Sequence, residues 1–466
     1  MIGKFLVTID ALTNFKDRNS AYNYWVLSLP SDPVSGNYTS ASAALSAPIV
    51  KAGYLLRTVQ VKGSTLALTG DLNATTPIEV IGGAPAKLSK LTFNGEELRF
   101  NQSKTGVVTA TAIYKNASFS VPDLATVGWK TTNSLPEIAA GYDDSQWTDA
   151  DLTYSNNTVR NLTTPTSLYA SDYGYHAGNL LYRGNFVASG NESSLYLFTQ
   201  GGSAFGASAW LNSTFLGSWL GYDAAMNGNN TFTLPNLIPG SSYIITVLMD
   251  NQGLDEDWTV GTDGNKNPRG ILNYRLSGRP QSSITWKLTG NLGGEDYKDR
   301  TRGPLNEGGL YTERQGWHLP GAPTSSWKNS SGPTEGIPSA GVAFYSTTFD
   351  LNMPTGYDIP LSISIANSTT VANGTRYEAY RAQIYVNGYQ FGKYVHNVGP
   401  QDLFSVPEGI WNYHGSNYLG ISLWALEAGG ARLRNLSLVA GPVIQSGYGP
   451  VELSPMTGWE ERVDAY

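Results

Sequence analysis

The sequence predicts an all-β protein of several domains, with one small β-sandwich followed by two related jelly-roll domains. Three observations predict this fold. Short strand-like runs alternate with turn residues, no window carries a long amphipathic helix pattern, and segments repeat at a spacing of about 175 residues. At roughly 100–200 residues per domain, a chain of 466 residues is long enough for about three domains.

Strand signals are runs of alternating or β-branched residues bounded by turn residues. They lie at 55–61, 78–81, 91–93, 107–112, 195–199, 243–249, 361–365 and 383–386. Asn94-Gly95 and Asn387-Gly388 each stand between apolar-rich strands. Because a type I′ turn needs positive φ at both central residues, each Asn-Gly pair predicts a tight hairpin.

The repeat matches four pieces of sequence in the same order. Residues 180–189 resemble 343–352, residues 210–217 resemble 385–392, and residues 242–248 resemble 417–423. The matched side chains are Tyr182 with Tyr345, Phe186 with Phe349, Asn212 with Asn387, Gly217 with Gly392, and Trp147 with Trp327. The repeat predicts two copies of one β-domain. The predicted division is 1–47 (remnant of a β-rich domain and linker), 48–120 (small sandwich), 121–300 (first jelly roll) and 301–466 (second jelly roll).

Composition excludes several classes of function. The formal net charge is −7 and no Lys/Arg-rich run occurs, so neither nucleic acid nor an anionic membrane is a predicted partner. The absence of cysteine excludes disulfides, thiolate nucleophiles and cysteine zinc sites. His176, His318, His396 and His414 do not stand at metal-ligand spacing, and no phosphate- or dinucleotide-binding loop is present. We therefore predict no metal and no cofactor.

The terminal sequence MIGKFLVTID is not a signal peptide. The chain nevertheless carries 13 Asn-x-Ser/Thr sequons, against about 6 expected from its composition, which favours a secreted glycoprotein. The alternative is that Asn, Ser and Thr are simply common in surface turns. The candidate sites are Asn37, Asn73, Asn101, Asn116, Asn156, Asn161, Asn191, Asn212, Asn229, Asn329, Asn367, Asn373 and Asn435.

Carboxylates gather in two places. In the first, Glu256, Asp257 and Trp258 follow an apolar strand almost directly, which places them on a loop. A sugar ring can stack on the indole while carboxylates accept its hydroxyl protons, so these residues are the predicted sugar-binding site. The alternative for Trp258 is packing between domains. The second cluster spans 295–314, where interleaved opposite charges predict a polar contact satisfied by its own ion pairs.

Five long strings of the sequence carry a family resemblance: DRNSAYNYW at 17–25, IVKAGYLLRT at 49–58, TQGGSAFGASAWLN at 199–212, RGPLNEGGLYTERQGWH at 302–318 and YVNGYQFGKYV at 385–395. These strings resemble fungal β-galactosidases of glycoside hydrolase family 35. The resemblance runs from about residue 16 to the end. It implies a secreted, glycosylated parent enzyme that hydrolyses terminal β-D-galactosides. In that enzyme a (β/α)8 barrel precedes a β-rich domain, a small sandwich and two jelly rolls.

The family's catalytic glutamates lie on barrel strands, so no position of this sequence is assigned to catalysis. The resemblance implies a non-catalytic C-terminal region that is inactive alone, has the N-terminal barrel as its partner, and shapes the site of the leaving-group sugar through Trp258. The alternative is a free-standing carbohydrate-binding or structural secreted glycoprotein. A third reading, an independent hydrolase that uses the acidic clusters, is the least favoured.

Overall fold

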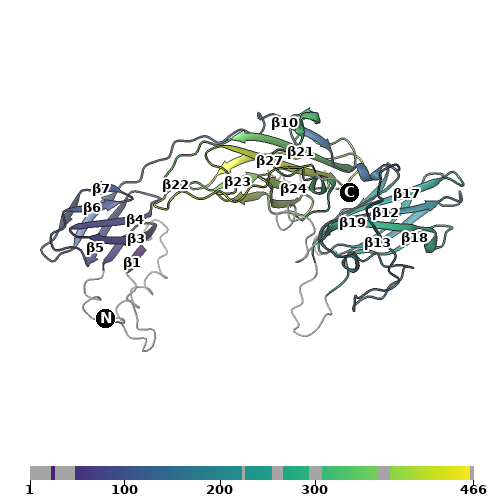
Figure 1. Ribbon diagram of the computed structural model, residues 1–466, viewed down its shortest axis with the longest axis horizontal. Coiled ribbons are helices and arrows are strands. Elements are labelled where there is room, and N and C mark those ends of the chain that lie inside the picture. Colours follow the sequence, from purple (N-terminus) through teal and green to yellow (C-terminus); the bar gives the residue numbers. More distant parts are fainter. Residues whose placement is uncertain are drawn as a thin grey trace, which may run out of the picture. The chain divides into compact units, whose positions relative to one another are not determined.

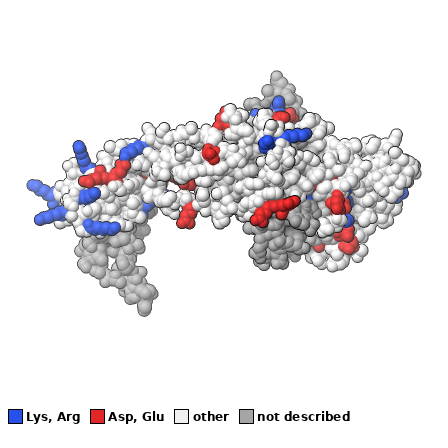
Figure 2. Space-filling view, turned by 45° about the horizontal axis from the view of Figure 1, so that its top comes forward, with Lys and Arg blue, Asp and Glu red and all other residues white. Residues whose placement is uncertain are grey.

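The structure is a computed structural model. It describes residues 23–26, 48–222, 226–253, 266–292, 307–365 and 378–461. These residues form strands and short helical turns, as the ribbon in Figure 1 shows, which confirms the predicted all-β class. Charged side chains are sparse on the face drawn in Figure 2, in keeping with a charged content of 14%. The chain divides into two compact units, of which the second is the larger.

The first unit is a sandwich of two sheets that share one core. The larger sheet has the order β1-β2-β5-β9-β8, and the smaller has the order β3-β4-β6-β7. Their bounds are β1 Asn23–Val26, β2 Ile49–Ala52, β5 Thr76–Gly82, β9 Val108–Ala112, β8 Phe100–Gln102, β3 Leu55–Lys62, β4 Thr65–Asp71, β6 Lys90–Phe93 and β7 Glu96–Leu98. Val50, Leu68 and Val80 point into the core, because alternate residues of a strand face one side. Strands β22 (Tyr357–Asp358) and β29 (Ile444–Gln445) also belong to this unit.

Both predicted Asn-Gly hairpins are confirmed. Asn94 and Gly95 have φ of 50° and 83° and join β6 to β7, where Phe93 pairs with Glu96. Asn387 and Gly388 have φ of 49° and 91° and join two strands of the second unit. Positive φ at both residues is the property that favours Asn and Gly at these positions.

The second unit holds two jelly rolls, each with a six-stranded and a three-stranded sheet. The first roll has β11-β19-β12-β17-β14-β15 and β16-β13-β18. Its strands are β11 Thr148–Asp149, β19 Thr285–Leu292, β12 Tyr175–Val187, β17 Ser242–Asn251, β14 Ala207–Leu211, β15 Thr214–Trp219, β16 Asn227–Thr233, β13 Ser194–Gln200 and β18 Gly270–Leu276. Residues of both sheets, among them Tyr182, Leu197 and Val247, form one buried core.

The second roll repeats this arrangement with β20-β10-β21-β27-β24-β25 and β26-β23-β28. Its strands are β20 Lys328–Ser330, β10 Trp129–Asn133, β21 Gly341–Asp350, β27 Ser416–Ala425, β24 Tyr380–Val386, β25 Tyr389–Val395, β26 Leu403–Val406, β23 Leu361–Ser364 and β28 Ser437–Ala440. The two six-stranded sheets therefore have matching strand orders, which supports the predicted duplication.

One strand of the second roll comes from an unexpected part of the chain. Strand β10 precedes the whole first roll in sequence, yet it pairs with β20 and β21. It occupies the place that β19 takes in the first roll, beside β12. The predicted division counted these residues with the first roll at 121–300. By strand pairing, the first roll is instead an insertion between β10 and β20 of the second.

Side-chain contacts bear out the repeat and correct its register. The Asn212 and Asn387 side chains accept the N–H of Ile244 and Tyr418, at 2.9 and 2.8 Å. Ile244 is thus equivalent to Tyr418, an offset of 174 residues. The third sequence match, which paired 242–248 with 417–423, was therefore wrong by one residue.

The matched glycines have the same structural role in the two rolls. A Cβ added to Gly217 would lie 2.8 Å from the ring of Phe232, and one added to Gly392 would lie 2.4 Å from the ring of Phe404. Each glycine therefore lets an aromatic ring of the facing sheet pack against its strand.

We predict unequal costs for removing the two equivalent asparagines. Asn387 is buried, and its Nδ2 also donates to the carbonyl of Ile410 at 2.6 Å. Asn387→Ala leaves two buried backbone groups without their partner and should lower the free energy of unfolding by about 3 kcal/mol. The matched Asn212→Ala should lower it by about 1 kcal/mol. Denaturant titration measures both, and equal costs would contradict this account.

Candidate functional site

The predicted sugar-binding residues Glu256, Asp257 and Trp258 lie outside the described residues. The structure does describe both ends of the segment that carries them. The chain enters the segment from β17, which ends at Asn251, and leaves it toward β18, which begins at Gly270. The candidate site is therefore built from the residues that hold these two ends.

The two ends of this segment are joined by a buried arginine. Arg269 is 3% exposed, and its Nε donates to the carbonyl of Gly253 at 2.8 Å. The Asn251 side chain accepts the N–H of Gly253 at 2.9 Å, while the N–H of Gln252 donates to the carbonyl of Gly201 at 2.7 Å. The Asn157 amide donates to the carbonyl of Lys266 at 2.8 Å. The base of the segment is thus fixed to the first roll.

Asp250 lies next to this base and is fully buried. Its Oδ2 accepts the N–H of Gly206 at 3.0 Å and lies 3.4 Å from Nε of Arg381. Its Oδ1 lies 3.0 Å from Nζ of Lys393. Arg381 and Lys393 come from β24 and β25 of the second roll. The carboxylate at the end of a first-roll strand is therefore neutralised by two cations of the other roll.

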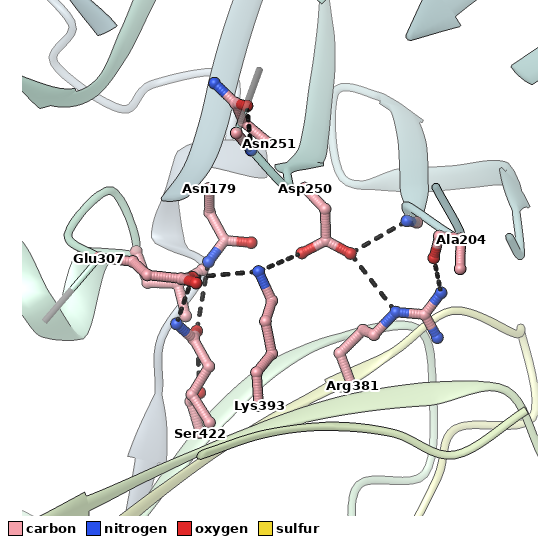
Figure 3. A network of polar contacts seen from close by, with 12 residues as sticks. Asn179, Ala204, Asp250, Asn251, Glu307, Arg381, Lys393 and Ser422 are labelled. Carbon is pink, nitrogen blue, oxygen red and sulfur yellow. Dashed lines mark hydrogen bonds and ion pairs between the residues drawn. The ribbon is translucent and has the colours of Figure 1, made fainter. Parts of the chain in front are cut away.

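Lys393 also reaches Glu307, the first described residue after 293–306. Its Nζ lies 3.0 Å from Oε2 of Glu307, between that carboxylate and Asp250 (Figure 3). Gln383 donates to the same Glu307 oxygen at 3.3 Å and accepts from the Asn179 amide at 3.2 Å. We call Asp250, Glu307, Arg381, Gln383 and Lys393 the junction network. Through this network, Asp250, which precedes residues 254–265, and Glu307, which follows residues 293–306, are bound to the sheet of the second roll.

A second buried ion pair and an apolar cluster support the junction. Arg314 pairs with Glu137, and both side chains are buried. Arg314 also donates through Nε to the carbonyl of Gly309 at 3.1 Å. Trp210 and Trp424, one from each roll, pack in a single hydrophobic cluster. The junction thus has the apolar and paired-ion composition of a domain interior.

Protonation equilibria at the junction follow from burial and charge. Burial opposes ionisation of Asp250, but the charges of Lys393 and Arg381 hold its pKa below the ordinary value. Burial and the nearby Glu307 carboxylate raise the pKa of Glu313 to about 7. Glu313 accepts a hydrogen bond from the Tyr385 hydroxyl at 2.9 Å. The junction therefore contains two carboxyl groups with different protonation behaviour: Asp250 stays ionised, whereas Glu313 titrates near neutral pH.

The second acidic cluster was expected to be satisfied by its own ion pairs. Two of its described members form ion pairs with residues outside the cluster, Glu307 with Lys393 and Arg314 with Glu137. Glu295, Asp296, Lys298, Asp299, Arg300 and Arg302 lie outside the described residues. Asp250 is fully buried between Lys393 and Arg381, so its carboxylate has no exposed oxygen to offer a sugar.

The histidines hold no ligand constellation in the part of the chain that the structure describes. His396 is buried, stacks on Tyr380 at 4.4 Å between ring centroids, and has its pKa lowered to about 4 by burial. His318 is also buried, whereas His176 and His414 are exposed. Within the described ranges, no three His, Cys, Asp or Glu side chains group as metal ligands. None of the described helices is long and apolar enough to cross a membrane.

Ten of the sequons fall within the described residues, while Asn37, Asn367 and Asn373 lie outside them. Nine of these ten asparagines are exposed, and Asn212 is half-buried in its hairpin. The exposed ones are Asn73, Asn101, Asn116, Asn156, Asn161, Asn191, Asn229, Asn329 and Asn435. An exposed amide is a geometric requirement for carrying a glycan in the folded protein, and these nine positions meet it.

Sequence reasoning missed Asp250, Arg381 and Lys393. A signal was present, because each is a charged residue in a strand whose other residues are uncharged and mostly apolar or aromatic, as in YIITVLMDN and YRAQIYV. A charge within such a strand is either exposed at an edge or buried with a partner. Pairing the charges of one repeat with those of the other would have suggested the second possibility.

Two domain families match the chain. The β-galactosidase second all-β domain matches twice, at residues 142–255 and 311–429, and β-galactosidase domain 3 matches residues 25–109. The two matches of one family agree with the duplicated rolls. The fold and the matches define this chain as all-β accessory domains of the β-galactosidase family, and the chain belongs to that family.

Several fungal β-galactosidases are close in sequence to this chain. The chain is 53% identical to β-galactosidase A of Aspergillus niger and to that of Aspergillus oryzae, and 50% identical to that of a Penicillium species. Each match covers 97% of this chain but only 44% of the relative. The chain thus spans less than half the length of the curated relatives it matches.

A solved glycoside hydrolase family 2 protein from Bacteroides cellulosilyticus also matches. The match covers 67% of this chain and 35% of the Bacteroides protein, at 10% identity and a TM-score of 0.19. That score is too low to support an argument about fold or function.

Removing the central cation of the junction network should destabilise the second unit strongly. Lys393→Met leaves Asp250 and Glu307 without their shared partner, and we expect a loss of about 3 kcal/mol in the free energy of unfolding. Lys287→Met is the matched control, because the ion pairs of Lys287 with Asp144 and Asp149 are longer, at 3.8 Å, and more exposed, and its shorter contact is a 3.0 Å hydrogen bond to the carbonyl of Asp144. The control should lose less than about 1 kcal/mol in the same denaturant titration. Similar losses in both variants would contradict the role of Lys393.

Glu313 should make stability depend on pH between about 4.5 and 7. Its folded-state pKa of about 7 lies above the ordinary value of 4.5, so its contribution is complete below 4.5 and is lost as pH rises through 7. As pH rises over this range, the free energy of unfolding of the native protein should fall by on the order of 2–3 kcal/mol relative to that of the Glu313→Gln variant. Unfolding free energies at a series of pH values test this. Parallel profiles of the two proteins would refute it.

Proposed function

We propose that this chain is the non-catalytic C-terminal region of a family 35 β-galactosidase. In the whole enzyme, a (β/α)8 barrel would hydrolyse terminal non-reducing β-D-galactosides. The domains described above would support that barrel and shape the site of the leaving-group sugar. The identity to fungal β-galactosidases over nearly the whole chain supports this assignment.

The observation that carries the proposal is the fixed base of the segment with Trp258. Asp250 is locked between Lys393 and Arg381, and Arg269 joins the two ends of the segment. A binding platform must be held within a fraction of an ångström to position a substrate productively. The junction network holds Asp250 just before the segment, and Arg269 holds the point where the segment rejoins the sheet.

Trp258, Asp257 and Glu256 have the chemistry that recognition of a leaving-group sugar requires. The indole offers an apolar face to the C–H groups of a pyranose ring. The two carboxylates accept hydrogen bonds from its hydroxyls. In this proposal they bind the acceptor or leaving-group sugar and take no part in bond cleavage.

The exposed sequons support a secreted, glycosylated parent enzyme. Nine of the ten described sequon asparagines lie on the surface, where a glycan can be accommodated. Extracellular location also agrees with a charged content of only 14%, because glycans and uncharged polar groups then provide solubility.

Trp258→Ala, in this chain joined to the barrel of a fungal relative, tests the proposal. We expect transglycosylation to added acceptor sugars to fall about 5- to 10-fold, because one sugar–aromatic stack contributes roughly 1–1.5 kcal/mol. The hydrolysis rate of an aryl galactoside should stay unchanged, since its leaving group is not a sugar.

Tyr154→Ala is the matched control, because Tyr154 is an exposed aromatic of the first roll that is 60% accessible. It should leave both reactions unchanged. Unaltered acceptor kinetics in the Trp258 variant would remove the proposed role of that residue. Retention of the isolated chain on galactan or lactose resin would instead favour a free-standing carbohydrate-binding glycoprotein.

A further inference from the structure

A groove of about 670 Å³ lies on the outer face of the three-stranded sheet of the first roll. Tyr196, Asn229, Asn273 and Arg275 are among its lining residues. Its volume falls within the range of about 300–1,000 Å³ that is typical of small-molecule sites. The lining combines an aromatic ring, amides and a guanidinium group, which is the chemistry of a sugar site and not of an apolar docking surface.

The strand register places a sequon beside the aromatic residues of this sheet. Asn229 and Thr231 are two residues apart on β16, so both side chains point to the same outer face, and both are exposed. Asn229 lies opposite Phe198 on the central strand β13, and Thr231 lies opposite Tyr196. Directly opposite residues have Cβ atoms about 4.5–5.5 Å apart. The Phe198 ring is covered by Arg160, whose guanidinium carbon lies 5.0 Å from the ring centre. Asn229 itself lines the groove, so a substituent on it begins at the rim of the groove.

The far side of the groove offers polar groups to such a substituent. Arg275 lies opposite Tyr196 on β18, with its guanidinium carbon 5.5 Å from the centre of the tyrosine ring. Asn273 lies opposite Phe198, and its Oδ1 accepts a hydrogen bond of 2.7 Å from Gln281, which fixes the amide. The Asn273 amide and the Arg275 guanidinium can then donate to sugar hydroxyls.

We propose that this groove seats the first sugars of an N-linked glycan carried by Asn229. In the linkage reaction, Nδ2 of Asn229 attacks the anomeric carbon of an N-acetylglucosamine carried on a lipid diphosphate. A C–N bond forms, the C–O bond to the diphosphate breaks, and the displaced amide proton leaves with the lipid diphosphate. The inference rests on the secretory origin proposed above, because only that route supplies the donor.

A tethered glycan fits this groove better than a free oligosaccharide. Attachment at the rim turns binding into an intramolecular step with an effective concentration in the millimolar range. The groove needs only weak affinity to hold such a ligand, and a few amide and guanidinium donors are sufficient for that. The glycan would then shield Tyr196 and strengthen the packing of the sheet.

The test uses the full chain produced in a fungal or yeast secretory host. Glycopeptide mass spectrometry should find Asn229 occupied, and a glycosidase applied to the folded protein should trim this glycan more slowly than the one on Asn101. Asn101 is the matched control, because it lies exposed on β8 opposite Thr109, with no aromatic residue directly across the strand pair.

A double-mutant cycle then measures the contact between glycan and groove. Asn229→Gln should lower the Tm by about 2–4 °C. The additional shift caused by Tyr196→Ala, or by the milder Arg275→Gln, should be smaller in the Asn229→Gln background than in the glycosylated protein. In the Asn101→Gln background, the Tm shifts caused by Tyr196→Ala and Arg275→Gln should equal those in the glycosylated protein.

The outcomes separate this inference from the proposal on which it rests. An unoccupied Asn229 beside an occupied Asn101, equal trimming of the two glycans, or additive effects throughout the cycle would overturn the groove assignment alone. A chain without glycans at any sequon would contradict the secretory origin and the groove assignment together.

Discussion

The insertion of one roll into the other is the constraint on which the rest of the second unit depends. Strand β10 lies before the first roll in the chain but completes the six-stranded sheet of the second roll. The second roll completes this sheet only when β10, which precedes the first roll in sequence, pairs with β20 and β21, which follow it. The junction between the rolls is consequently built like a protein interior, with Trp210 and Trp424 in one cluster and paired ions around Asp250 and Arg314.

This arrangement links stability to the proposed function. Lys393 bridges Asp250, which stands before the segment with Trp258, and Glu307, which stands after residues 293–306. Buried ion pairs seldom stabilise a protein more than apolar residues of the same shape would, so we propose that their contribution here is to the geometry of the junction. At this junction they hold Asp250, just before one segment, and Glu307, just after the other. In the proposed function, the junction would contribute to the whole enzyme by holding a recognition surface in place.

The sequence allowed much of the fold to be predicted, because its signals are local. Asn-Gly pairs specify hairpins through backbone φ, and Asn212 and Asn387 occupy equivalent turns with equivalent hydrogen bonds. The third match was off by one residue because two β-rich segments align almost equally well in adjacent registers. The pairing of β10 was not predictable, since the sequence WKTTN carries no information about its partner strand. The junction network was missed because Arg381 and Lys393 acquire partners only through tertiary structure.

Native-state hydrogen exchange of the intact chain tests most directly whether the two rolls form one cooperative structure. The account predicts that the slowest amides of β12 and β17 in the first roll open with the same free energy as those of β10, β21 and β27 in the second. It also predicts that loss of Lys393 lowers both sets equally. Separate opening free energies for the two rolls, with only one of them sensitive to Lys393, would contradict it.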